Sequence, residues 1–325
     1  MVGLILPIIL LVIGFVLLIK GADWLVDGAS SIATHFKVSK TLIGLTIVAF
    51  GTSAPELAVS ISSLANGSTD MLLGNVIGSN IMNVLLLIGI GAMICPIRVS
   101  RATTKKELPI LLLISTALVV LMLDVSLNSD PNNAFTRSDA IVCLLFFAIF
   151  LYYLIVMAKR NREMKATKKE KPKYRMGMAC LLTLLGLAGL VGGSQLVVNN
   201  AIEIAHVMGV ADRIIALTII AFGTSLPELV TTIVAAHKKE TDLIVGNIIG
   251  SNIFNICIVM GLPVAIFGTI TPESFEVVDI AMMVLSALFL FLVTRHDRKI
   301  NRREGALMLI VFVVYYGYIV YGALA

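Results

Sequence analysis

The chain has 325 residues, of which 58% are hydrophobic and only 14% charged, and its mean hydropathy is +0.99. This composition excludes a soluble domain and indicates an integral membrane protein. The apolar runs approach the ~20 residues that a transmembrane helix needs, whereas the strands of a membrane barrel alternate over ~10 residues. We therefore expect an all-α integral membrane protein. We expect no cleavable signal peptide, because no basic segment precedes the first apolar run.

The apolar runs predict ten transmembrane helices. In chain order they lie near 3–32, 41–65, 71–94, 107–127, 138–158, 176–203, 211–236, 242–268, 277–294 and 305–323. One long polar segment, KRNREMKATKKEKPKYR, separates the fifth helix from the sixth. We therefore expect a first five-helix repeat at 1–158, a basic linker at 159–175 and a second five-helix repeat at 176–325.

The basic residues of the loops predict the orientation of the chain. If the N-terminus lies outside, the inside loops hold 22 of the 25 Lys and Arg residues, and the outside loops hold only Arg137 and Arg213. Cytoplasmic loops carry such an excess of Lys and Arg. We expect a multi-pass protein of the cell (inner) membrane with both termini outside and the 159–175 loop in the cytoplasm. The same distribution accounts for the basic net charge without nucleic acid.

Two motifs occur twice at one fixed offset of 172 residues. The first reads AFGTSAPE at 49–56 and AFGTSLPE at 221–228, and the second reads GNVIGSNIMN at 74–83 and GNIIGSNIFN at 246–255. Because each half has five helices, the second copy must enter the membrane from the opposite side. The ten helices are thus expected to form two inverted repeats, and transporters of this design bind their substrate near the midplane between the repeats.

The first motif combines a predicted helix break with a carboxylate. Pro55 and Pro227 lack an N–H, so each frees the carbonyl four residues earlier, and the helix should kink there and expose nearby carbonyl oxygens. Glu56 and Glu228 follow in apolar sequence, where a carboxylate is costly and marks a functional site. Further oxygens at this level come from the hydroxyls of Thr52, Ser53, Thr224 and Ser225 and from the carbonyls around Ala49 and Ala221.

The second motif contributes more oxygen ligands, from Ser79, Asn83, Ser251 and Asn255. A serine and an asparagine four residues apart share one helix face. Hydroxyl, amide, carbonyl and carboxylate oxygens suit Na⁺, Ca²⁺ or Mg²⁺, and not zinc or copper. Two carboxylates in a low dielectric cannot both stay ionised without a neutralising cation, which Ca²⁺, several Na⁺ ions or protons could supply. The sequence therefore predicts one shared cation site whose occupants exchange.

A third polar group lies in the first predicted helix. Lys20, Asp23 and Asp27 occur there at helical spacing, which predicts an internal ion pair. Their counterparts in the second half include the uncharged Gln195 and Asn199.

The two motifs, the ten-helix count and the position of the linker together resemble the sodium/calcium exchanger branch of the calcium/cation antiporter superfamily. The resemblance spans essentially the whole chain and implies electrogenic exchange of Na⁺ for Ca²⁺, with the first and sixth helices sliding against the other eight. Potassium-dependent relatives carry Asp where this chain has Asn255, so the resemblance favours exchange without potassium. A short chain without regulatory domains resembles the prokaryotic members.

The resemblance also implies a role for each motif residue. Glu56 and Glu228 would bind Ca²⁺ and share Na⁺ with the surrounding groups. Na⁺ would be bound by the carbonyls of Ala49 and Ala221 and by the side chains of Thr52, Ser53, Thr224, Ser225, Ser79 and Ser251. Asn83 and Asn255 would complete the central region.

Several functions remain open from the residues alone. An H⁺/Ca²⁺ antiporter, or an antiporter of another cation, could use the same glutamates. An intramembrane protease lacks support, since neither suitable aspartates nor a zinc-protease cluster is present, and a channel would normally build its pore by oligomerisation. We expect a transporter and not an enzyme. We also expect no cofactor, no nucleic acid and no obligate protein partner; Na⁺, Ca²⁺ and the lipid bilayer are the expected partners.

Overall fold

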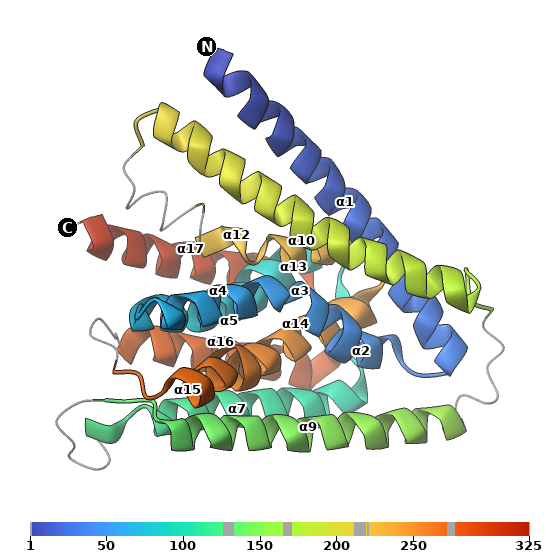
Figure 1. The fold of residues 1–325 in the computed structure, drawn as a ribbon. Coiled ribbons are helices and arrows are strands. Elements are labelled where there is room, and N and C mark those ends of the chain that lie inside the picture. The colour runs from blue at the N-terminus through green and yellow to red at the C-terminus, as the bar shows by residue number, and fades with distance from the viewer. Residues whose placement is uncertain are drawn as a thin grey trace.

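The computed structural model describes residues 2–125, 133–164, 171–210, 219, 221–271 and 277–324. Apart from two short paired strands, the regular structure in these residues is helical (Figure 1). The first half contains α1 (Val2–Phe36), α2 (Lys40–Ile43), η1 (Gly44–Val48), α3 (Ala49–Thr52), α4 (Ala54–Ala65), α5 (Thr69–Met82), η2 (Asn83–Leu87), α6 (Ile88–Ile94), η3 (Thr103–Glu107), α7 (Leu108–Leu121) and α9 (Arg137–Met164). The segments labelled η are π-helical turns within longer helices.

The second half repeats this order. It contains α10 (Met176–Val207), α12 (Ala221–Gly223), α13 (Leu226–His237), α14 (Thr241–Phe254), η6 (Asn255–Met260), α15 (Gly261–Phe267), α16 (Val277–Asp297) and α17 (Arg302–Leu324). Joined end to end, the pieces follow the ten predicted helices in order, although residues 211–218 and 220 of the seventh lie outside the described part. The all-α fold with two inverted repeats is confirmed.

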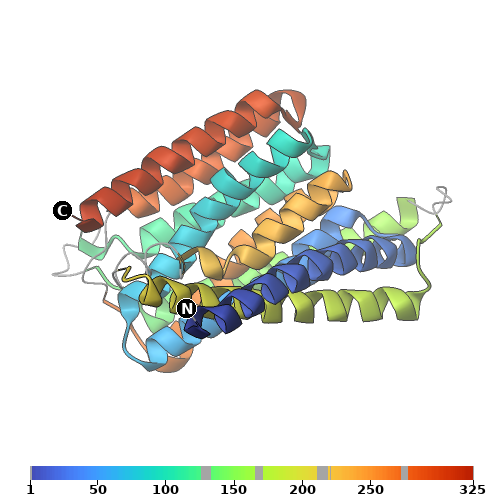
Figure 2. The ribbon, with the colours of Figure 1, turned by 90° about the horizontal axis from the view of Figure 1, so that it is seen from above.

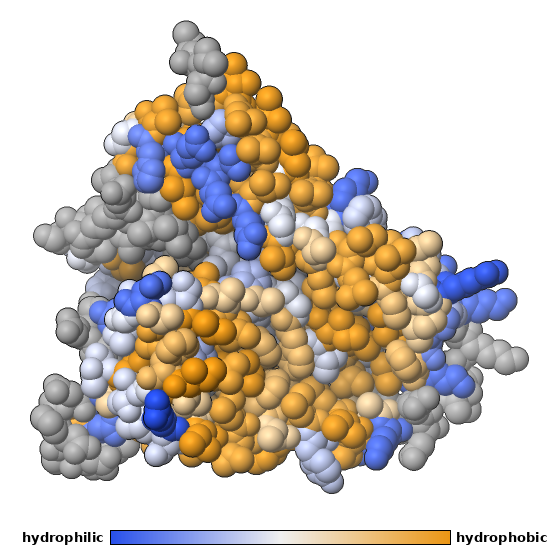
Figure 3. Space-filling model, viewed as in Figure 1, coloured by the Kyte–Doolittle hydropathy of each residue, from blue (hydrophilic) through white to orange (hydrophobic). Residues whose placement is uncertain are grey.

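Most of these helices can cross a membrane. In the described residues, seven are long and apolar enough, and an eighth counts when Lys40–Thr52 and Ala54–Ala65, bent by 43°, form one span. The predicted helix at 107–127 is not among them, because its apolar part, α7, has only 14 residues and follows the charged end of η3. In Figure 3 apolar residues cover the middle of the visible face, and hydrophilic residues gather at its right-hand edge.

Helices α1 and α10 form an antiparallel pair on one side of the molecule (Figures 1 and 2). A Cβ built on Gly14 would lie 2.9 Å from the carbonyl oxygen of Gly193, and one built on Gly21 would lie 2.8 Å from that of Gly186. Gly14 matches Gly186, and Gly21 matches Gly193, at the repeat offset. The two contacts are therefore related by the pseudo-two-fold axis, and glycine lets the two backbones approach this closely.

The second-motif helices occupy the centre. In the most apolar 18-residue stretch of the helix over Thr241–Phe267, 94% of the residues are buried. In the corresponding stretch of Leu4–Phe36, only 22% are buried. Gly246 and Gly250 of α14 pack against η1 and its neighbours, since a Cβ on either would lie within 3 Å of Leu45 or Thr41 backbone atoms. In the second half, these glycines therefore let adjacent helices approach closely, whereas a Cβ on the equivalent Gly74 or Gly78 of the first half would meet no described atom within 4 Å.

Strand pairs at two places again relate the halves. β1 (Ile97–Arg98) pairs antiparallel with β2 (Lys299–Ile300), so that Ile97 faces Ile300. An isolated antiparallel bridge joins Phe135 to Ile270. Each pair ties a loop of the first half to a loop of the second, which fixes the two repeats against each other around the central helices.

Candidate cation site

Both copies of the first motif break a helix in the same way. Ser53 separates α3 from α4 with φ −86° and ψ 8°, and Ser225 precedes α13 with φ −86° and ψ 4°. A proline follows in the first turn of each new helix, a position where proline is well tolerated. The predicted kinks are confirmed. They place Glu56 and Glu228 in the first turns of α4 and α13, where the helix dipole favours an anion.

The carbonyl that proline leaves free has a partner in the second copy. Pro227 cannot donate to the carbonyl of Gly223, and this oxygen instead accepts a hydrogen bond from Ser194 Oγ of α10 at 2.8 Å. The position equivalent to Ser194 in the first half is Ala22, which has no hydroxyl. This bond therefore ties α10 to its broken helix in a way that α1 cannot repeat.

The carbonyl of Ala49 is not freed by the break, which differs from the prediction. Ser53 N donates to it at 3.0 Å, because the helical hydrogen bonding continues up to the break. The hydroxyls of Thr52 and Ser251 lie 3.4 and 3.5 Å from the same oxygen. Ala49 thus connects the first motif of one half to the second motif of the other. Its counterpart Ala221 begins α12.

The two glutamates are each held by a serine of the opposite repeat. Ser53 Oγ donates to Glu228 Oε1 at 3.0 Å, and Ser225 Oγ donates to Glu56 Oε1 at 3.4 Å. Both glutamates are 1% exposed. The crossed pairs bring the two copies of the first motif together at one buried place, as the fixed offset predicts.

The threonines of the first motif also cross to the opposite repeat. Thr52 Oγ1 donates to Asn247 Oδ1 at 3.2 Å, and Thr224 Oγ1 donates to Asn75 Oδ1 at 3.4 Å. Asn75 Nδ2 in turn donates to the carbonyl of Glu56 at 3.0 Å. Sequence reasoning missed Asn75 and Asn247, although both stand in the GN pair of the duplicated second motif and match at the repeat offset.

The second-motif residues meet at the interface, but less symmetrically. Asn255 Nδ2 donates to Ser79 Oγ at 3.1 Å, whereas Asn83 Nδ2 donates to Asn252 Oδ1 at 2.9 Å. Asn252 Nδ2 then donates to the carbonyl of Asn80 at 3.2 Å. Asn80 and Asn252 are therefore further buried members of this layer that the sequence did not single out.

Two of these asparagines, Asn83 and Asn255, each begin a π-helical turn. Asn83 is the first residue of η2, Asn255 is the first residue of η6, and η1 ends directly before Ala49. Such wide turns inside α-helices are frequent at functional sites, because they change which backbone groups are bonded and where side chains point.

Four of the predicted ligands each have a buried side-chain oxygen with no hydrogen-bond donor among the described residues. These four oxygens are Glu56 Oε2, Glu228 Oε2, Asn83 Oδ1 and Asn255 Oδ1. A buried polar atom without a partner is costly, so such oxygens call for a ligand. All four are hard acceptors. The described residues contain no cluster of three or more His, Cys, Asp or Glu side chains of the kind that holds a transition metal. The set fits an alkali or alkaline-earth cation.

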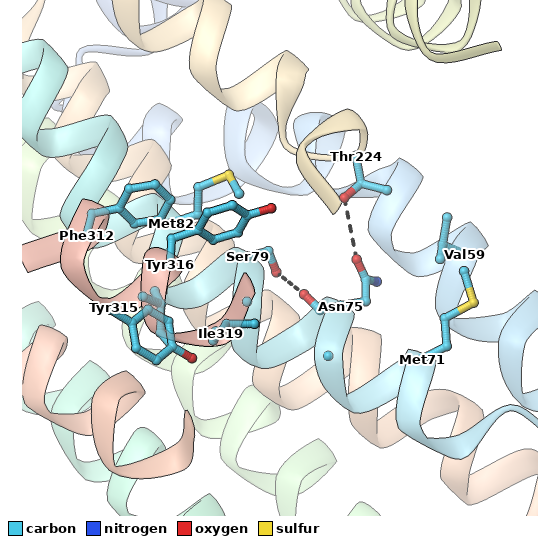
Figure 4. A pocket seen from close by; sticks show the side chains of 13 residues that line it. Val59, Met71, Asn75, Ser79, Met82, Thr224, Phe312, Tyr315, Tyr316 and Ile319 are labelled. Atoms are coloured by element: carbon cyan, nitrogen blue, oxygen red, sulfur yellow. Dashed lines mark hydrogen bonds between the residues drawn. The ribbon is translucent and has the colours of Figure 1, made fainter. Parts of the chain in front are cut away.

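A cavity of about 380 Å³ lies beside this layer (Figure 4). Asn75, Ser79 and Thr224 are on its wall, and the figure shows Thr224 and Asn75 pointing toward one another across it. Most of the other lining side chains are apolar or aromatic and come from α4, α5 and α17. Two of the predicted ligands, Ser79 and Thr224, therefore line this cavity.

A third buried carboxylate lies outside both motifs. Glu107 ends η3, is fully buried, and accepts a hydrogen bond from the Tyr153 hydroxyl of α9. At the repeat offset Glu107 matches another acid, Asp279, which accepts a hydrogen bond from the Tyr315 hydroxyl at 2.7 Å. This match, and the position of Glu107 directly before an apolar helix, could have marked it as costly to bury.

The predicted ion pair inside α1 is wrong. Asp23 and Asp27 pair with Lys238, at the C-terminal end of α13, at 2.6 and 2.7 Å, and not with Lys20. Lys173 also pairs with Asp27 at 2.6 Å, and this hydrogen bond raises the pKa of the Lys173 ammonium. Helical spacing placed the acids on one face of α1 but could not reveal partners more than 140 residues away.

Comparison with known proteins agrees with this architecture. The family model for the sodium/calcium exchanger protein matches residues 6–156 and 178–321. The putative antiporter CaxA of Alkalimonas amylolytica is 40% identical over 94% of this chain and 96% of its own length. The inner membrane protein YrbG of Escherichia coli (strain K12) is 36% identical over 94% of each chain.

A solved structure of the sodium-calcium exchanger NCX_Mj has the same fold. It superposes with a TM-score of 0.83 at 32% identity, over 97% of this chain and 99% of the other. Together with the two matched repeats, this shows a multi-pass, all-helical cation/calcium exchanger and not an enzyme. The chain belongs to the sodium/calcium exchanger family.

Proposed function

We propose that this protein exchanges Na⁺ for Ca²⁺ by alternating access at the site between the two repeats. The observation that carries the proposal is the crossed pairing of Ser53 with Glu228 and of Ser225 with Glu56. It leaves one free oxygen on each buried carboxylate. Two such oxygens from opposite repeats supply the charge that one divalent cation neutralises.

In this proposal Glu56 and Glu228 bind Ca²⁺ and also contribute to Na⁺ binding. Asn83 and Asn255 offer their free amide oxygens to the central region. The remaining Na⁺ ligands are the carbonyls of Ala49 and Ala221 and the hydroxyls of Thr52, Ser53, Thr224, Ser225, Ser79 and Ser251. Solved structures of NCX_Mj come from crystals soaked with Na⁺, Ca²⁺ or Sr²⁺, which supports the same ion classes here.

Obligatory exchange follows from the cost of burying charge. An unoccupied pair of carboxylates in low dielectric repels itself, so the site moves only when cations neutralise it. One Ca²⁺ or several Na⁺ ions meet that requirement. The moving parts in our proposal are α1 and α10, whose contact is lined by glycines on both helices.

The orientation follows from the loop charges. We place both termini outside and the 159–175 loop in the cytoplasm, because 22 Lys and Arg residues then lie inside. The relative YrbG is an inner membrane protein, and we assign the same membrane to this chain. The boundaries 1–158, 159–175 and 176–325 remain our division of the chain.

Uptake of radioactive Ca²⁺ into proteoliposomes tests the coupling ion. Vesicles loaded with Na⁺ and diluted into Na⁺-free buffer should accumulate Ca²⁺, and choline-loaded vesicles should not. A parallel arm applies a pH gradient without Na⁺. Uptake in the Na⁺ arm alone supports the proposal, whereas uptake driven by the pH gradient alone replaces it with H⁺/Ca²⁺ exchange. Uptake under neither gradient contradicts Ca²⁺ as the cargo.

A further inference from the structure

A second cavity, of about 570 Å³, lies between the start of the fourth helix and the end of the ninth. Its lining residues are Arg101, Thr104, Lys105, Pro109, Phe291, Arg295 and Arg298. None of them belongs to the duplicated motifs. The two walls are held together by β1 and β2, and by the hydrogen bond from Val99 N to the Arg298 carbonyl at 2.8 Å. The cavity is thus built from both repeats and is separate from the cation site.

One end of this cavity is strongly basic. Four of the seven lining residues are the cations Arg101, Lys105, Arg295 and Arg298, and all four are exposed. Among the described residues none of the four side chains has an ion-pair partner. Four like charges around one cavity repel each other and create a strong positive field.

Neither of the acidic side chains closest to these cations in the sequence, Asp297 and Glu107, forms an ion pair with them. Asp297 Oδ1 accepts a hydrogen bond from the backbone N of Lys299, and Glu107 is fully buried against Tyr153. An anion from outside the chain is therefore the natural partner. Guanidinium groups form paired, charge-assisted hydrogen bonds with phosphate oxygens in particular.

The other end of the cavity is apolar and lies toward the middle of the helices. Pro109 stands one turn after Lys105 in α7, and Phe291 stands one turn before Arg295 in α16. The same helices continue inward with exposed apolar side chains, among them Leu113 at 62% and Leu292 at 52%. A ligand that fills this groove must be anionic at one end and apolar at the other.

We infer that this groove is a binding site for an anionic phospholipid. The phosphate lies among the four cations, and an acyl chain follows Phe291 and Pro109 onto the exposed apolar faces of α16 and α7. Basic pockets between membrane helices bind anionic headgroups in this way. A free phosphate ion would satisfy the cations but would leave the apolar end uncovered, so the lipid is the better match.

Native mass spectrometry of the purified protein in a nonionic detergent tests the inference. The protein is titrated with phosphatidylglycerol, with phosphatidylcholine and with inorganic phosphate. The double variant R295Q/R298Q should bind phosphatidylglycerol about 30-fold more weakly than the wild type, since each basic residue near an anionic lipid contributes about a fivefold factor. The variant R302Q/R303Q, which removes two exposed cations of the same loop region outside the cavity, should bind like the wild type.

Three results would overturn the inference. Equal binding of phosphatidylcholine would remove the need for an anionic headgroup, and competition by inorganic phosphate as strong as by the lipid would make free phosphate the ligand. An equal loss in R302Q/R303Q would assign the effect to surface charge rather than to the cavity. Thermal unfolding of both double variants without added lipid should match the wild type, which shows that they are folded.

Discussion

At the scale of single residues, the two threonine hydroxyls of the first motif donate hydrogen bonds to asparagines of the second. Asn247 accepts the Thr52 hydroxyl, and Asn75 accepts that of Thr224. Each bond crosses from one repeat to the other. It directs the hydroxyl proton toward the asparagine, so the lone pairs of the threonine oxygen stay available to a cation. We therefore regard Asn75 and Asn247 as positioning residues for the proposed Na⁺ ligands.

Asn247→Ala should weaken Na⁺ binding while the protein stays folded. The variant removes one hydrogen bond, which contributes about 0.5–1.5 kcal/mol, so the Na⁺ concentration for half-maximal exchange should rise about 2- to 12-fold. The measurement is the Na⁺ dependence of Ca²⁺ exchange in proteoliposomes. Asn66→Ala is the matched control, because the Asn66 side chain is exposed and, among the described residues, bonds only to Ser62. An unchanged Na⁺ dependence in Asn247→Ala would argue against the positioning role.

The sequence predicts that the two copies of each motif meet between the repeats, but it does not predict how their side chains pair. The fixed offset predicts that Glu56 and Glu228 meet, and the structure brings them to the same crossed pairs. Ser53 donates to the glutamate of the other repeat because of how the two broken helices pass each other. No local sequence pattern encodes that arrangement. For the same reason the acids of α1 were wrongly paired with Lys20.

At the scale of helices, the α1–α10 contact depends on glycine. A Cβ on Gly186 would lie 2.6 Å from the backbone N of Leu25 and 2.7 Å from the carbonyl oxygen of Gly21. Backbone atoms cannot move aside without separating the helices. Glycine at this position therefore sets how closely the two proposed moving helices pack.

Gly186→Ala should slow exchange and destabilise the protein. Overpacking of this kind costs about 1–3 kcal/mol, so we expect a lower midpoint of thermal unfolding and a reduced rate of Na⁺-driven Ca²⁺ uptake. Gly192→Ala is the control on the same helix, since a Cβ there meets no described atom within 4 Å. Alanine favours a helix more than glycine does, so the midpoint of thermal unfolding of Gly192→Ala should equal or exceed that of the wild type. Similar losses in both variants would contradict the role of close packing.

The order of the helices could be predicted, because apolar runs and the Gly-Thr-Ser-x-Pro breaks are local signals. The π-helical turns η1, η2 and η6 could not, since no residue type marks them and neighbouring helices decide them. The carbonyls beside the break also differ from prediction. The Ala49 carbonyl stays bonded to Ser53, while that of Gly223 depends on Ser194 of another helix.

At the scale of the whole molecule, the two repeats are inverted but not equivalent. Ser194 ties α10 to its broken helix, whereas α1 has Ala22 and is instead held by Asp23 and Asp27 through Lys238. The first two helices of each half therefore have different attachments on the two sides. Such differences let one orientation of the site be favoured over the other without changing the ligands.

The most direct test of our account is Ca²⁺ uptake by Glu56→Gln, Glu228→Gln and the double variant, driven by a Na⁺ gradient. Glutamine keeps the shape of the side chain and removes its charge. If both carboxylates form one site, each single variant loses uptake as completely as the double variant, and all three unfold thermally like the wild type. Glu203→Gln, at an exposed position of α10, should keep full uptake. Single variants that retain about half or more of the uptake would contradict a shared site between the repeats.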